Sequence, residues 1–194
     1  NPDGGIPARA YSIANTPRPD GELVLQVART EGGITSNWVH DHLQPGARLT
    51  LAGAYGSFIG DPSMDTPVLC LAAGTGLAPI LALTEAALRR GFRQPVSVVF
   101  SARTRADIYG QGLMAWWRAR HPGFDYRITL TRERQHGYLA GRIRAVLPGL
   151  FSDLSKHTVF AAGSPDFVAS CVNAVKALGA RPELIHTEAF FARQ

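Results

Sequence analysis

Cysteine is scarce in this chain of 194 residues, which has only Cys70 and Cys171. The two lie far apart and form no Cys-x-x-Cys pair, the spacing typical of zinc and iron–sulfur ligands. We therefore expect no metal site on this chain, and both thiols should behave as small buried hydrophobic side chains. Sparse cysteine also favours a reducing compartment, so the expected location is the cytoplasm.

Long hydrophobic runs are absent as well. No stretch approaches the roughly 18 apolar residues that a membrane helix requires, and no basic start is followed by an apolar segment as in a signal peptide. We expect no membrane partner. With 45% hydrophobic and 18% charged residues, the composition is that of a globular protein and argues against a disordered or fibrous chain.

Acidic residues are fewer than basic ones, 15 against 20, which gives a formal net charge of +5. The excess is mostly arginine and is scattered along the chain. A clustered basic stripe with interleaved aromatic residues would indicate nucleic-acid binding, so no nucleic-acid partner is expected. Arginine also binds phosphate-bearing cofactors and acidic protein partners, and charge alone does not choose between these.

The pattern of the chain changes near residues 60–66, a turn-rich stretch. Before it, short extended segments alternate with turns. Leu23 and Leu25 alternate with their neighbours as in a strand of a small antiparallel β-barrel or sandwich. A short helix is expected over residues 37–43, with the hydroxyls of Thr35 and Ser36 before it as its cap.

After this junction, strands alternate with amphipathic helices, which predicts right-handed crossovers and a parallel sheet covered on both faces. The clearest helix is residues 166–178, with Gly179 as its stop. We predict an α/β nucleotide-binding domain with a five-stranded parallel sheet over residues 64–194, preceded by part of a small antiparallel β-barrel over residues 1–63. The expected strands of the sheet are residues 68–73, 96–101, 126–131, 158–162 and 183–186.

The sharpest local signal is a buried strand that runs straight into Gly74, Thr75 and Gly76 and then into a helix that opens near Pro79. Glycines allow a tight turn, and the free N–H groups of a helix start attract phosphate. One interpretation is a pyrophosphate cradle for a dinucleotide, and the other is a plain strand–turn–helix corner. The third glycine of the Gly-x-Gly-x-x-Gly fingerprint is absent, and Arg103 rather than an acidic residue follows the next strand.

Four further segments are weak signals when each is taken alone. Residues 9–15 place an arginine near a tyrosine in a strand, and residues 32–36 present backbone amides at a helix start. Both also have structural interpretations, as a surface strand and a capped turn. Residues 159–168 form a second strand–glycine–helix corner, and residues 187–191 form an acidic and aromatic tail.

In their order and spacing these segments resemble the ferredoxin-NADP reductase superfamily, and most of all the reductase components of bacterial ring-hydroxylating oxygenases. The segments that carry the resemblance read RAYSIAN, GGITS, GAYGSF, GTGLAP, SARTRADIY, AGSP and EAFF, and they extend over essentially the whole chain. The resemblance implies a ferredoxin reductase-like fold, with FAD bound by residues 1–63 and NAD(P) by residues 64–194.

The resemblance also implies roles for single residues. Arg9 would pair with the flavin pyrophosphate, Tyr11 would pack on the flavin, and Ser12 would lie near flavin N5. Catalytic roles are implied for Ser12, Thr75 and Glu188. The residues implied in cofactor binding are Arg9, Tyr11, Ser12, Ile13, Gly33, Ile34, Thr35, Ser36, Gly74, Thr75, Gly76, Leu77, Ala78, Pro79, Arg103, Arg132, Gly163, Ser164, Pro165 and Phe190.

The implied activity is electron transfer from NAD(P)H through FAD to an iron–sulfur centre or an oxygenase. The expected partners are a ferredoxin or iron–sulfur domain and a terminal oxygenase, and a [2Fe–2S] cluster is expected only on a missing N-terminal domain or on a partner. Two alternatives stay within the superfamily, a free-flavin reductase and the reductase half of a flavohaemoglobin. A third is a non-catalytic basic binding module whose glycine corners are merely turns.

The sequence departs from the family pattern at several positions. Ala162 replaces the cysteine before Gly163, and Ala54 replaces a proline. The family barrel has further strands before the first motif, so its N-terminal part is expected to be missing here. Arg103 and Arg132 stand where a 2′-phosphate could bind, which favours NADPH, yet similar reductases with an arginine after this strand commonly use NADH. We favour NADH.

Overall fold

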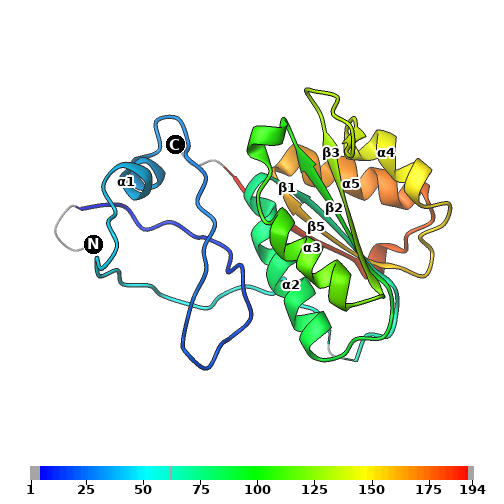
Figure 1. The fold of residues 1–194 in the computed structure, drawn as a ribbon, viewed down its shortest axis with the longest axis horizontal. Coiled ribbons are helices and arrows are strands. Elements are labelled where there is room, and N and C mark those ends of the chain that lie inside the picture. Colours follow the sequence, from blue (N-terminus) through cyan, green and yellow to red (C-terminus); the bar gives the residue numbers. More distant parts are fainter. Residues whose placement is uncertain (1–4, 62, 192–194) are drawn as a thin grey trace.

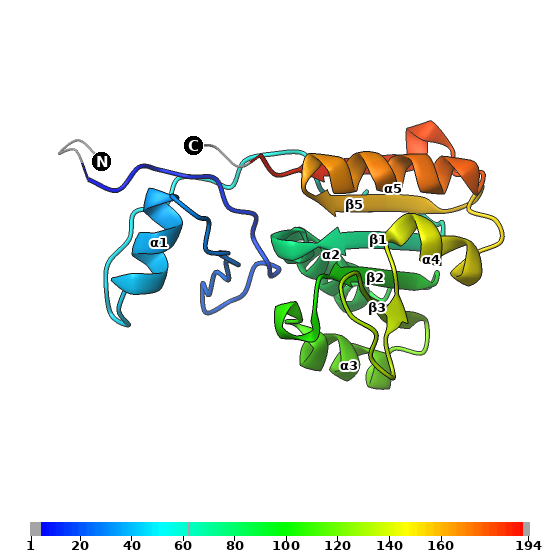
Figure 2. The same cartoon turned by 90° about the horizontal axis from the view of Figure 1, so that it is seen from above.

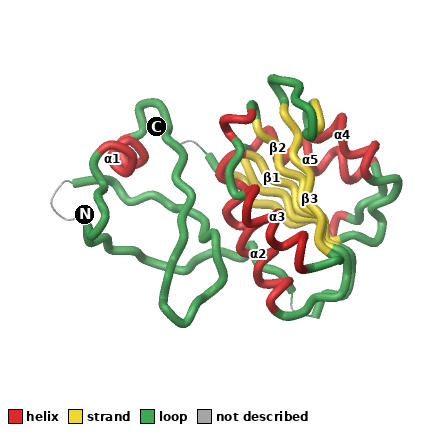
Figure 3. Tube along the Cα trace, viewed as in Figure 1, coloured by secondary structure: helices red, strands yellow, loops and turns green. Residues whose placement is uncertain are grey.

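The computed structural model describes residues 5–61 and 63–191, which form two parts that lie side by side (Figure 1). The first part, up to the turn-rich stretch, is mostly irregular, and the second is a layered α/β unit (Figure 3). The predicted class, a parallel sheet with covering helices, is confirmed.

The sheet has six parallel strands in the order β4-β3-β2-β1-β5-β6. The prediction of five strands was wrong, because β4 has two residues and so short a strand shows no alternation in the sequence. The last strand also lies later than predicted, since Pro182–Leu184 form a 3₁₀ turn before it. The strands are β1 Val68–Ala73, β2 Val96–Ala102, β3 Phe124–Leu130, β4 Leu139–Ala140, β5 Thr158–Gly163 and β6 Ile185–Ala189.

Helices cover both faces of the sheet. Alternate residues of β1 serve the two cores, since Val68 and Cys70 face the helices α2 and α3 while Leu69 and Leu71 face α4 and α5. A strand buried on both faces reads as a continuous apolar run, which is why β1 was predicted with its observed bounds. The helices are α2 Leu77–Arg89, α3 Gln111–Arg120, α4 Ile143–Leu150 and α5 Pro165–Ala177.

Local signals account for the helix ends that were predicted well. In α5, the Ser164 hydroxyl accepts the N–H of Phe167, Pro165 occupies the first turn, and Gly179 follows the helix with a φ of +88°. In α3, adjacent tryptophans divide between core and surface. Trp117 is 3% exposed, and its neighbour Trp116 is 50% exposed.

The first part of the chain departs most from the prediction. Over residues 5–61 the one helix is α1, Ile34–Asp41, and the expected barrel strands appear as extended segments joined by a single antiparallel bridge between Ile13 and Leu25. Leu49 and Leu51 are more than half exposed. A strand requires a partner for its backbone groups, and among the described residues these segments have too few partners to form a ladder.

In residues 5–61 and 63–191, no helix has the length and apolar character needed to span a bilayer.

The turn after β1 packs closely against the end of β5. Gly76 lies so near that a Cβ built on it would overlap the carbonyl oxygen of Ala162 and come within 2.7 Å of the amide nitrogen of Gly163. Only a glycine allows this approach of two backbones. The contact aligns the two glycine corners that the sequence singled out.

Replacing Gly76 with alanine tests this packing. Because one of the corners must move, we expect a loss of about 2–4 kcal/mol in the free energy of unfolding. The control is Gly112→Ala, since Gly112 lies in α3 with open space at its Cβ position and alanine there stabilises a helix by about 1 kcal/mol. Urea denaturation measures both variants, and equal effects would contradict the close approach.

Candidate functional site

The strand order has a switch point at the carboxyl ends of β1 and β5, and we refer to this edge of the sheet as the crevice. The connections leave β1 toward β2 on one side, while β5 lies on the other side of β1. In open α/β sheets, ligands bind at the carboxyl ends of the strands where the order reverses in this way. The predicted glycine corners, residues 74–76 and 163–165, follow β1 and β5 and therefore flank this switch point.

The corner after β1 leaves backbone donors free for a phosphate. Gly74–Gly76 form a 3₁₀ turn that continues directly into α2, and no side chain caps either start. Gly74 has a φ of +54°, and a Cβ at this residue would meet no atom within 4 Å. Open space beside unpaired N–H groups at a helix start suits the pyrophosphate of a dinucleotide.

The corner after β5 contacts both the end of β1 and the C-terminal segment. Gly163 packs against β1, because a Cβ there would lie 3.2 Å from the carbonyl oxygen of Ala73. The carbonyl oxygen of Gly163 accepts the backbone N–H of Phe190 at 2.8 Å. This bond places the half-buried Phe190 beside the glycine corner, although α5 and β6 lie between the two in sequence.

One hydrogen bond joins the two parts of the chain at this crevice. The hydroxyl of Ser12 donates to Oε1 of Glu188 at 2.9 Å, across 176 positions of sequence. Burial raises the pKa of Glu188, and the bond from Ser12 opposes that shift. The segment with Tyr11 and Ser12 therefore lies beside β6, and Figure 2 shows the first part of the chain beyond the edge where β1 and β5 end.

A second contact between the parts was not predicted. Glu85 of α2 accepts the backbone N–H of Thr16 at 2.8 Å and lies 3.9 Å from the guanidinium of Arg18 and 3.0 Å from that of Arg89. Burial alone would raise the pKa of Glu85, but the hydrogen bonds from Thr16 and the two arginines hold it below its usual value. A sequence signal existed only for the spacing of Glu85 and Arg89 on one helix face.

The helix start at residues 33–36 is organised differently from the prediction. Gly33 precedes α1, and no side chain caps the helix. Instead, the hydroxyl of Thr35 donates to the carbonyl oxygen of Pro7 at 2.7 Å, and the buried Ser36 hydroxyl accepts the N–H of Thr30. The expected hydroxyl cap was therefore wrong, because both hydroxyls tie α1 to neighbouring segments. In Figure 1, α1 lies far from the α/β unit, and Ile34 is 61% exposed.

The two arginines expected near a ribose lie side by side. The backbone N–H of Arg132 donates to the carbonyl oxygen of Arg103 at 2.9 Å. The guanidinium of Arg103 donates to Asp107 at 2.7 Å, and Asp107 also accepts two bonds from Thr104. Arg103 thus already has an anionic partner. Arg9 is exposed, and its guanidinium donates to the carbonyl oxygen of Ala8.

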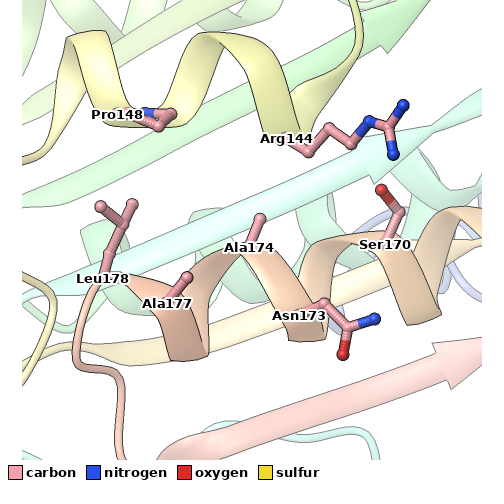
Figure 4. Close-up of a pocket in the computed structure, with 7 residues that line it drawn as sticks. All are labelled: Arg144, Pro148, Ser170, Asn173, Ala174, Ala177 and Leu178. Atoms are coloured by element: carbon pink, nitrogen blue, oxygen red, sulfur yellow. The ribbon is translucent and has the colours of Figure 1, made fainter.

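A groove of about 480 Å³ lies elsewhere, between α4 and α5 on the outer face of the molecule (Figure 4). None of the residues expected in cofactor binding lines it. Its lining residues are Arg144, Pro148, Ser170, Asn173, Ala174, Ala177 and Leu178. The candidate site is therefore the crevice and not this groove.

The family described as oxidoreductase NAD-binding domain matches residues 70–173, which include both glycine corners. The chain belongs to this family. The family described as oxidoreductase FAD-binding domain matches residues 2–59. The resemblance to ferredoxin-NADP reductase-like proteins is thereby confirmed.

Curated relatives agree with this assignment. The chain is 30% identical over 185 residues to the ferredoxin–NAD(P)(+) reductase component of the naphthalene 1,2-dioxygenase system of Pseudomonas putida, covering 95% of this chain and 56% of the relative. It is 37% identical over 158 residues to ferredoxin–NADP reductase B of Sorangium cellulosum, covering 78% and 62%. The chain therefore spans little more than half the length of these relatives.

Solved structures share the fold. The Amycolatopsis cytochrome P450 reductase GcoB superposes with a TM-score of 0.88 at 31% identity, covering 97% of this chain and 58% of that chain. The ferredoxin reductase in carbazole 1,9a-dioxygenase gives a TM-score of 0.83 at 26% identity, covering 94% and 55%. Both confirm the ferredoxin reductase-like fold.

The variant Glu85→Gln tests the second contact between the parts. Glutamine still accepts the Thr16 N–H but carries no charge for Arg18 and Arg89, so we expect a loss of about 1 kcal/mol in the free energy of unfolding at neutral pH. The folded protein lowers the pKa of Glu85, so this contribution is complete above the unfolded pKa. It is lost as the pH falls through the folded-state pKa.

Denaturation curves between neutral and acidic pH measure this effect. The variant should show a shallower loss of stability in acid than the wild type. The control is Glu22→Gln, because Glu22 also pairs with Arg18, at 2.9 Å, but is exposed and contacts only the first part of the chain. Acid profiles that coincide for wild type and Glu85→Gln would contradict the role of Glu85.

Proposed function

We propose that this protein is an FAD-containing reductase that accepts electrons from NAD(P)H and passes them to an iron–sulfur centre or an oxygenase. The observation that carries the proposal is the Ser12–Glu188 hydrogen bond, which brings the flavin-type segment to the crevice formed by the two glycine corners. The relatives' printed names, reductase components of dioxygenase systems, support the choice of a ferredoxin or iron–sulfur domain and a terminal oxygenase as partners.

The first part, residues 1–63, would hold FAD, and residues 64–194 would hold the nicotinamide nucleotide. Arg9 and the backbone of residues 33–36 would bind the flavin pyrophosphate. Tyr11 and Phe190, both half-buried, would pack on the flavin ring. The chemistry that a bound flavin supplies is the conversion of a two-electron hydride donation into the release of single electrons.

The chain's own residues would position the two cofactors, shield them from water and hold a proton. Ser12 donates a hydrogen bond at the crevice, and Glu188 accepts it. Because burial raises the pKa of Glu188, this carboxyl exchanges a proton nearer to neutral pH than an exposed one does. The pair could therefore hold a proton at the place where the flavin would bind. Thr75, at the turn after β1, would lie between the two cofactors.

NADH is the nucleotide that we propose. A 2′-phosphate carries negative charge, and the residues near Arg103 supply two carboxylates. Asp107 pairs with the Arg103 guanidinium, and Glu133 accepts the backbone N–H of Arg105. Arg103 is thus neutralised locally, so it favours a 2′-phosphate less than its position in the sequence indicates.

We propose the reducing cytoplasm as the location, because Cys70 and Cys171 are both free, buried thiols.

The full-length protein tests the proposed function. It should purify with a flavin absorbance, and NADH should bleach that absorbance anaerobically. Addition of an oxidised [2Fe–2S] ferredoxin should restore it. A protein that binds no FAD, or whose flavin is reduced by neither nucleotide, would contradict the proposal. A flavin that dissociates in each turnover would instead indicate a free-flavin reductase.

The variant Ser12→Ala removes the hydroxyl that faces Glu188. We expect the rate of flavin reduction to fall at least about tenfold while FAD stays bound, because the variant removes the Ser12–Glu188 bond at the place where the flavin would react. Stopped-flow absorbance measures the rate, and an unchanged rate would refute this role. The control is Ser155→Ala, which breaks a similar bond, 2.8 Å from Ser155 to Asp153, far from the crevice in sequence and on another loop.

Asp107→Asn tests the account of nucleotide preference. Without the carboxylate, the Arg103 charge is free to attract a 2′-phosphate, so the ratio of kcat/KM for NADPH to that for NADH should rise roughly three- to tenfold. Steady-state kinetics with both nucleotides measure it. Asp125→Asn is the control. It also removes a carboxylate from an arginine, since Asp125 pairs with Arg127 at 2.6 Å, but this pair lies in β3 and does not involve Arg103. A ratio unchanged in Asp107→Asn would count against the proposed role of Asp107.

A further inference from the structure

Tyr109 contacts the turn after β1 from a different part of the chain. It lies between the 3₁₀ turn Arg105–Asp107 and α3, and its hydroxyl donates to the carbonyl oxygen of Gly74 at 2.7 Å. Its ring packs edge-on against Phe100 of β2, with 5.5 Å between the ring centroids and 78° between the planes. The ring is thus fixed by the core, and the hydroxyl is directed at a single backbone atom.

This hydrogen bond sets the orientation of one peptide group. The carbonyl and N–H of a trans peptide point in opposite directions, so a Gly74 carbonyl held toward Tyr109 directs the N–H of Thr75 away from it. That N–H belongs to the first turn, whose donors have no partner within the helix. Within the 3₁₀ turn the same carbonyl also accepts the N–H of Leu77, so the Tyr109 hydroxyl is a second donor that reinforces one orientation of this peptide. Gly74 has a φ of +54°, a region that favours glycine, where such a second bond restricts the backbone further.

The segment that carries Tyr109 is itself firmly held. Thr104 and Asp107 form a reciprocal capping box around the 3₁₀ turn, and Arg103 bonds to the same carboxylate. On the other side, Gly110 has a φ of +68° and lies against Leu77 at the start of α2. The connection between β2 and α3 therefore links the proposed ribose end of the nucleotide to the turn that would receive its pyrophosphate.

We propose that Tyr109 is a positioning residue for the pyrophosphate of the dinucleotide, because its hydroxyl holds the Gly74–Thr75 peptide with the N–H available to the phosphate. This inference rests on the proposed function. Tyr109 contacts the backbone of the turn and is not a catalytic residue. Burial raises the pKa of Tyr109, so the hydroxyl stays protonated and able to donate throughout the physiological range.

The test is the affinity of the full-length protein for ADP-ribose, which carries the pyrophosphate but not the nicotinamide. Isothermal titration calorimetry of Tyr109→Phe should give a dissociation constant roughly three- to tenfold above that of the wild type, the effect of one lost hydrogen bond. In the holoenzyme, KM for the nucleotide should rise by a similar factor with kcat nearly unchanged, the pattern of lost uniform binding.

Tyr138→Phe is the matched control. Tyr138 packs against the same core, and its hydroxyl donates to the side chain of Gln111 at 3.3 Å rather than to the turn. Its affinity for ADP-ribose should equal that of the wild type. Phenylalanine keeps the ring in place in both variants, and their melting temperatures check that the fold is retained.

An unchanged dissociation constant in Tyr109→Phe would overturn the inference and leave the proposed function standing. An equal rise of the dissociation constant in both tyrosine variants would also overturn it, because the loss of affinity would then come from a disturbed core and not from the bond to Gly74. A wild-type protein that binds neither ADP-ribose nor NADH would instead overturn the proposed function, and the role of Tyr109 with it.

Discussion

The close approach of two glycine corners is the constraint on which the rest of the site depends. Gly76 meets the backbone at Ala162 and Gly163 without a side chain between them, so the ends of β1 and β5 lie at contact distance. This brings the N–H donors of one helix start beside the carbonyl that anchors Phe190. A nucleotide site built from backbone in this way tolerates wide variation in side chains, which fits relatives near 30% identity.

The two parts of the chain are joined by carboxylates of the α/β unit. Glu188 binds the hydroxyl of Ser12, and Glu85 binds the backbone of Thr16, so a short segment of the first part is held at two points. These bonds serve different purposes. The bond to Glu188 lies at the crevice and involves a carboxyl with a raised pKa, whereas Glu85 has a lowered pKa and acts as a structural anchor on α2.

Sequence reasoning located the fold and the motifs but not the contacts between them. The apolar run of β1 and the stop at Gly179 are local signals, so they predicted their elements well. The strand β4 was missed because two residues show no periodicity. Tyr109 and Glu85 were missed because their roles depend on contacts with Gly74 and Thr16, which lie 35 and 69 positions away in sequence. No local pattern encodes such a contact.

The central claim is that flavin and nicotinamide meet in the crevice between the two parts, held mainly by main-chain amides. A crystal structure of the full-length protein with FAD and a non-reducing NADH analogue tests it most directly. We expect the flavin ring between Tyr11 and Phe190, with the nicotinamide beside Thr75. Density for either ligand elsewhere, for example in the groove between α4 and α5, with the crevice empty, would contradict it.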